Sequence, residues 1–257
     1  MPIAKTASRA GFALLLSLGF AAGCSTKDGS ADCCHDCCAA PTTAPATKPA
    51  AGAATKPSAA APATQKTEAA AAWKDLFDGK TLTHWKVADY AGKGDPAVED
   101  GLIILPSGEG LTGVTWKGEA LPKTNYEIEV VAKRIDGVDF FCGITFPVND
   151  TFATLVTGGW GGAVVGISSL DDEDAAHNET TVYEKFEKGK FYTFKVRVEP
   201  ENITAWIDAK EVVNVSIKDK KVSIRGDIDQ STPLGLASWQ TTSGIKSVKV
   251  RKLEAGK

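Results

Sequence analysis

The segment YTFKVRVEPENITAWID, residues 192–208, decides the fold class of this 257-residue chain. In residues 192–198 aromatic and β-branched side chains alternate with polar ones, and residues 203–207 repeat the same pattern. An alternation with a period of two places the apolar side chains on one face of a β-strand. The turn-forming residues Pro-Glu-Asn at 200–202 lie between the two runs, so the segment predicts a β-hairpin.

The same alternation extends over the rest of the chain from residue 100 onward. Residues 126–132 alternate most clearly, Asp208-Ala209-Lys210 forms a second predicted turn, and no long run follows the helical period of 3.6. Further strands are predicted at residues 101–105, 140–146, 154–156, 163–168, 212–217, 234–239 and 245–253. About ten to twelve strands with one apolar face each predict an all-β protein in which two antiparallel sheets pack as a sandwich.

The N-terminal part of the chain cannot contribute to such a core. From Ala21 to Ala72 there is no Leu, Ile, Val, Phe, Tyr or Trp, and all six Trp residues come later. Residues 73–257 therefore form one predicted domain, which argues against a two-domain or multi-pass membrane protein. The formal net charge of −3 gives no basic surface, so nucleic acid is not an expected partner.

Residues 1–24 have the features of a targeting signal. Two basic residues, Lys5 and Arg9, precede an apolar run at 11–20 that is too short to span a bilayer. The sequence Ala-Ala-Gly then precedes Cys24, which resembles the lipobox of bacterial lipoproteins with Ala21 in place of the usual Leu. The resemblance implies a signal peptide at 1–23, lipidation of Cys24 and attachment to a membrane of the bacterial cell envelope, periplasmic or surface-exposed. An ordinary cleaved signal peptide is the alternative.

Residues 24–72 are predicted to be a disordered tether rich in Cys, Ala and Pro, because they cannot bury enough apolar area to offset their ordering entropy. The hexapeptide CCHDCC at 33–38 leaves three interpretations open: soft-metal binding, disulfides to a neighbouring chain, and no function. Cys142 differs, since it lies in an apolar segment and is predicted to be buried and unreactive.

The start of the predicted domain carries a family motif. The sequence LFDGKTLTHWK at 76–86 resembles the opening L-F-[ND]-G-K-x-L-x-x-W of the DUF1080 family, also called the 3-keto-disaccharide hydrolase domain. Matching segments follow in order at 125–130, 205–208, 235–239 and 245–250. The resemblance covers residues 73–254 and implies a concanavalin-like jelly roll with a face suited to sugars.

Two strands depart from the family pattern. Family members usually carry N-S-G-I-F-x-R on a central strand, and residues 140–146 here read FFCGITF. The family's W-x-x-E-x-Q-I strand is replaced by TGGWGGAVVGI at 157–167. The acidic and amide residues that the resemblance would assign to catalysis are therefore absent.

Candidate site residues must then come from the chemistry of this sequence. In the glycine run at 158–162, Trp160 either stacks on a sugar ring or is a core residue within a wide β-bulge. The acidic loop contains Asp171, Asp172 and Asp174, which suit a divalent metal such as Ca²⁺ or are simply solvated. The candidates for a general base are Glu179, His177 and Asp139. The alternative for Glu179 and His177 is a polar loop without chemistry.

Three further polar or aromatic residues are candidates for substrate binding. Trp239 lies on the opposite strand face from its apolar neighbours, Gln240 follows it, and Arg197 points away from the predicted core. The alternative is that these side chains only pack on the sheet surface. Two functions are consistent with a carbohydrate as the binding partner. The first is a hydrolase of glycosides or 3-keto-disaccharides, in which the keto group permits elimination of the aglycone followed by hydration. The second is a lectin-like binding module without chemistry.

Overall fold

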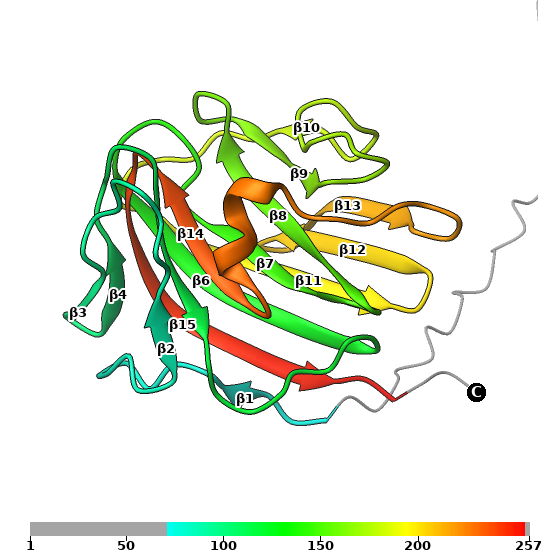
Figure 1. Ribbon diagram of the computed structural model, residues 1–257, viewed down its shortest axis with the longest axis horizontal. Helices are drawn as coiled ribbons and strands as arrows, with labels where there is room; N and C mark the ends of the chain where they lie inside the picture. The colour runs from blue at the N-terminus through cyan, green and yellow to red at the C-terminus, as the bar shows by residue number, and fades with distance from the viewer. Residues whose placement is uncertain (1–70, 255–257) are drawn as a thin grey trace, which may run out of the picture. The chain divides into compact units, whose positions relative to one another are not determined.

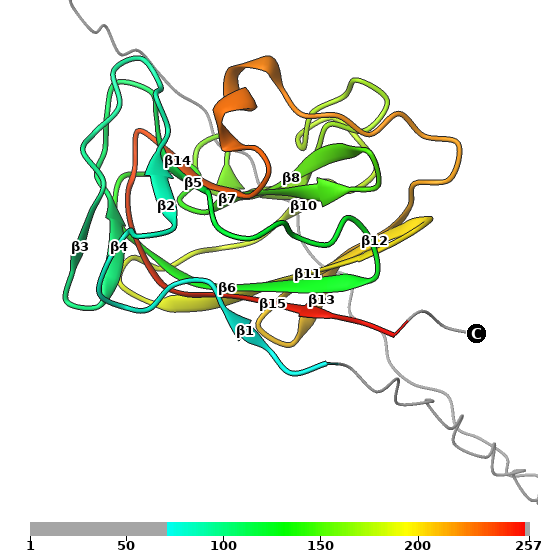
Figure 2. The ribbon, with the colours of Figure 1, turned by 60° about the horizontal axis from the view of Figure 1, so that its bottom comes forward.

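The computed structural model describes residues 71–254. Within them, fifteen β-strands form two antiparallel sheets stacked face to face, and one short 3₁₀ helix is the remaining regular element. Figure 2 shows the sheets as two layers, with the 3₁₀ helix η1 (Gly226–Ser231) on the outer side of the smaller one. The predicted all-β sandwich is confirmed, and almost all regular structure is strand.

The larger sheet has the order β13-β12-β11-β6-β15-β4-β3, with β1 also paired to β15 (Figure 1). Its strands are β1 (Lys74–Asp75), β3 (Ala97–Glu99), β4 (Leu102–Leu105), β6 (Tyr126–Asp136), β11 (Phe191–Glu199), β12 (Asn202–Ile207), β13 (Lys210–Ser216) and β15 (Thr242–Lys252).

The smaller sheet has the order β10-β9-β8-β7-β14-β5-β2. Its strands are β2 (Trp85–Val87), β5 (Leu111–Trp116), β7 (Gly143–Val148), β8 (Thr151–Gly159), β9 (Val164–Ser168), β10 (Val182–Tyr183) and β14 (Gly235–Trp239). Strands β8 and β9 are consecutive in the chain and form a hairpin. Strands β14 and β5 are far apart in the chain but pair in the sheet, as a jelly roll requires.

The core lies between the sheets and contains the side chains that the alternation predicted to point inward. Tyr126, Ile128 and Val130 of β6 are fully buried, as are Phe194 and Val196 of β11. Cys142 is fully buried too, and burial raises the pKa of its thiol, which agrees with the predicted unreactive cysteine.

Several strands were not visible in the sequence pattern. β1, β2, β3 and β10 have only two or three residues, too few to display a period. β5 is buried on both faces, so it shows no alternation. The predicted strand at 140–146 begins only at Gly143, because Phe140 and Phe141 belong to the preceding loop.

The family motif at 76–86 forms a structural corner. The indole nitrogen of Trp85 donates a hydrogen bond to the carbonyl oxygen of Leu76 at 2.9 Å, and its ring packs edge-on against Trp116. The carboxylate of Asp78 accepts hydrogen bonds from the backbone N–H groups of Lys80 and Thr81, which lower its pKa. The motif therefore fixes the entry of the chain into the sandwich.

No helix among residues 71–254 is long and apolar enough to cross a membrane. The predicted signal peptide, the Cys24 lipidation site and the tether with its cysteine cluster lie outside the described residues.

Candidate functional site

A groove of about 280 Å³ lies on the outer face of the smaller sheet, lined by strand residues and by the segment that carries η1. Its floor is paved by the small polar side chains of Thr145, Thr154 and Ser168, which follow one another across β7, β8 and β9 in register. Thr145 and Thr154 share a hydrogen bond of 2.9 Å between their hydroxyl oxygens. The remaining hydroxyl lone pairs can meet a polar ligand.

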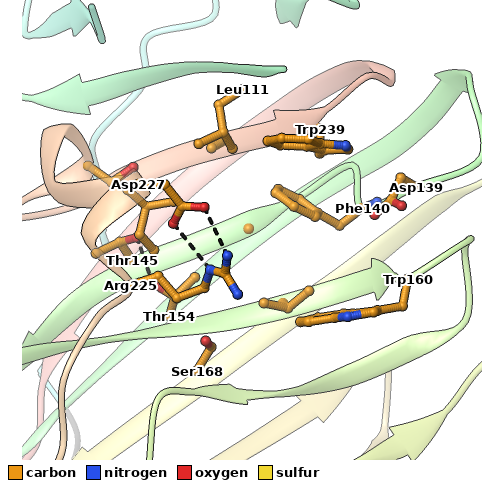
Figure 3. Close-up of a pocket in the computed structure, with 15 residues that line it drawn as sticks. Leu111, Asp139, Phe140, Thr145, Thr154, Trp160, Ser168, Arg225, Asp227 and Trp239 are labelled. Atoms are coloured by element: carbon orange, nitrogen blue, oxygen red, sulfur yellow. Dashed lines mark hydrogen bonds and ion pairs between the residues drawn. The ribbon is translucent and has the colours of Figure 1, made fainter. Parts of the chain in front are cut away.

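Aromatic side chains form the rim of this groove (Figure 3). Trp160 is 45% exposed and Trp239 is 36% exposed, and Phe140 lies between them in the close-up. Gly110 lies against the indole of Trp239, where an added Cβ would come within 3.6 Å of the ring. Exposed indoles around a polar floor are typical of surfaces that stack on sugar rings.

Asp139 enters the groove from the loop between β6 and β7. Its carboxylate accepts hydrogen bonds from the backbone N–H groups of Phe140 at 2.7 Å and Gly161 at 3.1 Å. Its own N–H donates to the hydroxyl of Thr241 at 3.1 Å. These contacts hold the carboxylate in place and tie its loop to the loop that presents Trp160.

A buried arginine behind the groove organises both loops. One terminal nitrogen of Arg134 (Nη2) donates to the carbonyl oxygens of Asp139 at 3.0 Å and of Gly158 and Gly162 at 3.3 Å each. Its guanidinium lies over the ring of Phe141, 5.0 Å from the centroid. Burial lowers the pKa of Arg134, and the negative charge of Asp139 opposes that shift. Arg134 was not among the candidates from the sequence, although it continues the inward-facing positions 126, 128, 130 and 132 of β6, where a charged side chain indicates a buried polar contact.

Close contacts account for two glycines of the run at 158–162. A Cβ on Gly158 would lie 2.6 Å from the Arg134 guanidinium, and one on Gly162, where φ is +113°, would lie 2.6 Å from the carbonyl oxygen of Val138. The predicted bulge is present, as a register shift between Thr157 and Gly159. The alternative that Trp160 is a core residue is wrong, since its side chain is exposed at the groove.

A charged pair forms the opposite end of the groove. Arg225 precedes η1 and Asp227 lies within it, and the two side chains make a two-pronged contact with nitrogen-to-oxygen distances of 3.2 and 3.1 Å. A second carboxylate, Asp174, lies 3.6 Å from the other terminal nitrogen of Arg225 (Nη1). The segment is anchored by the hydroxyl groups of Tyr90 and Ser231, which are 2.6 Å apart. Burial raises the pKa of Tyr90 to about 12, so it is a neutral hydrogen-bonding group.

The structure gathers three of the predicted site residues in this groove: Asp139, Trp160 and Trp239. Two other predicted bases lie elsewhere. Glu179 is 2.5 Å from the ammonium nitrogen of Lys220, and His177 is an exposed ring whose Nδ1 lies 2.7 Å from Asp174. Neither lines the groove.

The predicted substrate-binding residues Arg197 and Gln240 have other partners. Arg197 lies in the larger sheet and binds the buried carboxylate of Glu127 at 2.7 Å. Gln240 directs its side-chain nitrogen to the carbonyl oxygen of Glu109 at 2.8 Å, outside the groove lining. Both residues have a structural role in these contacts.

The predicted metal ligands do not converge. Asp171 contacts Lys220 and the backbone N–H of Lys221, Asp172 pairs with the ammonium of Lys221, and Asp174 pairs with His177 and Arg225. Within residues 71–254 no three His, Cys, Asp or Glu side chains are grouped so as to hold a metal ion. The acidic loop therefore does not fit a Ca²⁺ site, which needs several oxygen ligands around one point.

The two-sheet antiparallel sandwich, with an aromatic-rimmed groove on one sheet, has the fold of the concanavalin-like β-sandwich class. Within this class, the chain belongs to the family of 3-keto-alpha-glucoside-1,2-lyase-like domains, whose match covers residues 72–253. Membership agrees with the motif at 76–86 and supports a carbohydrate-related function.

Solved structures support the same fold at low sequence identity. The apo Crh5 transglycosylase is 17% identical with a TM-score of 0.51, covering 70% of this chain and 83% of that one. Crh5 in complex with NAG is 17% identical with a TM-score of 0.51, covering 71% and 84%. A chain from the endo-acting O-glycanases with which members of the human gut microbiota initiate mucin breakdown is 15% identical with a TM-score of 0.50, covering 70% and 100%. Among curated protein sequences there is no significant match.

Proposed function

We propose that the domain binds a carbohydrate in the groove and cleaves glycosides that carry a keto group at C3 of the sugar. The observation that supports this most directly is the position of Asp139. Of the three predicted bases it alone lines the groove, beside Trp160, in a chain of the 3-keto-alpha-glucoside-1,2-lyase-like family. A base next to a sugar-stacking surface is the arrangement that an elimination requires.

The keto group makes a single base sufficient. A carbonyl at C3 acidifies the hydrogen on C2, so Asp139 removes that proton and the electron pair forms an enolate. The enolate then collapses to the ketone, a double bond forms between C1 and C2, and the bond from C1 to the aglycone oxygen breaks. The proton passes from Asp139 to the leaving oxygen, and water subsequently adds across the new double bond. This route differs from that of glycosidases with two carboxylates.

The other carboxylate in the groove is less suited to act as the base. Both oxygens of Asp227 contact the Arg225 guanidinium, which neutralises its charge. Asp139 accepts bonds from two neutral backbone N–H groups instead. The lone pairs that these two bonds leave free on the Asp139 oxygens can accept the C2 proton.

A binding module without chemistry is the second candidate. It is favoured by the two exposed indoles of Trp160 and Trp239, which suffice to hold a saccharide without any reaction. Incubation of the full chain with a 3-keto-disaccharide and with its unoxidised parent separates the two functions. We expect that only the keto sugar is consumed, and chromatography detects the monosaccharide that is released. Binding of either sugar with no release would contradict the hydrolase and leave the binding module.

Trp160→Ala and Trp239→Ala are each expected to weaken binding of the unoxidised parent disaccharide about tenfold, because each removes a stacking surface from the groove. Titration calorimetry measures the effect. Trp206→Ala is the matched control, since this indole stacks on Lys195 in the larger sheet, 4.3 Å from the ammonium nitrogen. Equal losses in all three variants would argue against the groove as the binding site.

We also propose that Cys24 anchors the protein to a membrane of the bacterial cell envelope, with residues 24–72 as a spacer. The support is the sequence alone: a basic start, a short apolar run and small residues before Cys24. In a bacterial host, Cys24→Ala should move the protein from the membrane fraction to the soluble fraction, as read by immunoblot. Cys33→Ala should remain with the membrane. If Cys24→Ala also stays there, the lipid anchor is ruled out.

A further inference from the structure

The charged end of the groove contains a cation that the candidate residues from the sequence did not include. Arg225 is the one Lys or Arg among the residues that line the groove in the described part of the chain. Figure 3 shows its guanidinium pointing into the groove, between Asp227 and the floor residues. Its side chain is 48% exposed, so a ligand can reach it.

Most of its hydrogen-bonding capacity is unused. A guanidinium has five N–H groups. Two of them, one on Nε and one on Nη2, bind the carboxylate of Asp227. The other three have no hydrogen bond to any residue within 71–254. Asp174 is the nearest further carboxylate, but at 3.6 Å from Nη1 it forms an ion pair and is too distant for a hydrogen bond. These donors remain for an oxygen atom of a bound ligand.

The guanidinium is also held in a fixed orientation. Asp227 holds one edge by a two-pronged contact, and Asp174 lies beside the other terminal nitrogen. The hydrogen bonds and charge of Asp227, together with the charge of Asp174, raise the pKa of Arg225, so it stays charged. Donors that are oriented before the reaction stabilise developing charge better than donors that must reorganise.

We propose that Arg225 binds the keto oxygen at C3 of the sugar and stabilises the negative charge that this oxygen gains in the enolate. This inference rests on the proposed function and names the substrate feature that the groove recognises: a carbonyl in place of a hydroxyl. When the C2 proton moves to Asp139, the electron pair of the C2–H bond becomes the C2=C3 double bond and the charge appears on the C3 oxygen. The unused N–H groups of Arg225 donate to that oxygen. When the carbonyl forms again, the charge leaves with the aglycone oxygen, which takes the proton from Asp139.

The test compares Arg225→Gln and Arg225→Lys with the full wild-type chain on a 3-keto-disaccharide. Arg225→Gln should lower kcat about 10²–10³-fold, as the loss of a donor to an oxyanion does, and Arg225→Lys should recover part of it. Affinity for the unoxidised parent disaccharide should change less than about threefold in both. Lys221→Gln is the matched control, because this cation pairs with Asp172 away from the groove.

A second readout separates this inference from the proposed function. Wild type should bind the 3-keto-disaccharide more tightly than its parent, measured by tryptophan fluorescence, and Arg225→Gln should lose that preference. If wild type shows the preference without turnover, the proposed hydrolase fails while the role of Arg225 in recognition stands. If Arg225→Gln keeps the preference, keeps kcat within about threefold, or loses affinity for both sugars equally, the inference is overturned.

Discussion

Replacement of Asp139 by Asn is expected to lower turnover of a 3-keto-disaccharide about 10²–10⁴-fold, the range over which a positioned general base contributes. The amide cannot accept the C2 proton. Its oxygen can still accept hydrogen bonds from the N–H groups of Phe140 or Gly161, so the loop should keep its conformation. Steady-state kinetics should show the loss in kcat, with binding of the unoxidised parent disaccharide retained.

Asp136→Asn is the matched control for this experiment. Asp136 lies three residues earlier, is exposed and pairs with Lys188 at 2.7 Å, away from the groove lining. Its replacement should leave kcat unchanged. If Asp139→Asn retains activity within about threefold of wild type, another group is the base and the proposed assignment fails.

Replacement of Glu127 by Gln is expected to lower the free energy of unfolding by about 3 kcal/mol. This value is at the lower end of the cost of breaking a buried ion pair, because both arginine partners are partly exposed. The Glu127 side chain has no exposure, and its two oxygens lie 2.7 Å from Arg197 Nη2 and 2.5 Å from Arg251 Nη2. The neutral amide would leave both guanidinium groups without their counter-charge. Denaturant unfolding at neutral pH measures the difference.

The same residue predicts a pH dependence. Burial raises the pKa of Glu127, but the hydrogen bonds and charges of Arg197 and Arg251 outweigh it, so the net pKa lies below the ordinary 4.5. A lowered folded-state pKa means that this stabilisation is present above pH 4.5 and is lost as the pH falls through the folded-state value. The difference in free energy of unfolding between wild type and Glu127→Gln should therefore become smaller at acidic pH.

Glu129→Gln provides the control, because Glu129 lies two residues along the same face of β6 and is only half-buried. A change within about 0.5 kcal/mol is expected for it. The difference in free energy of unfolding between wild type and Glu127→Gln could instead be the same at neutral and acidic pH. That result would show that the carboxylate charge does not cause the stabilisation.

The fold could be predicted because alternation along a strand is a local property. Residues 126–132 and 192–198 show in sequence which side chains are buried, and the structure buries them. The motif at 76–86 and its family were likewise readable, since short-range contacts such as Trp85 to Leu76 fix that corner. Very short strands and the doubly buried β5 carry no local period, so they were missed.

The site was only partly predictable, because it depends on which strand ends meet. Trp160 and Trp239 stood out as large aromatics at glycine-rich or strand-end positions, and both line the groove. Arg197 and Glu179 looked equally available in sequence, but the pairing of β11 with β6 takes Arg197 to Glu127, and a salt bridge takes Glu179 to Lys220.

By itself the sequence determined the sandwich, the extent of the folding domain and its family, since each rests on local alternation, composition or a continuous motif. Only the tertiary structure decided the site. Asp139 and Arg225 come from segments far apart in the chain, and both line one groove because the loop after β6 and the segment before η1 pack on the same face of the smaller sheet. Arg134 holds the Asp139 loop and the glycine loop from behind that groove. Arg134 and Asp139 are held largely by backbone carbonyl and N–H groups, which almost every residue carries and which leave no signature in the sequence.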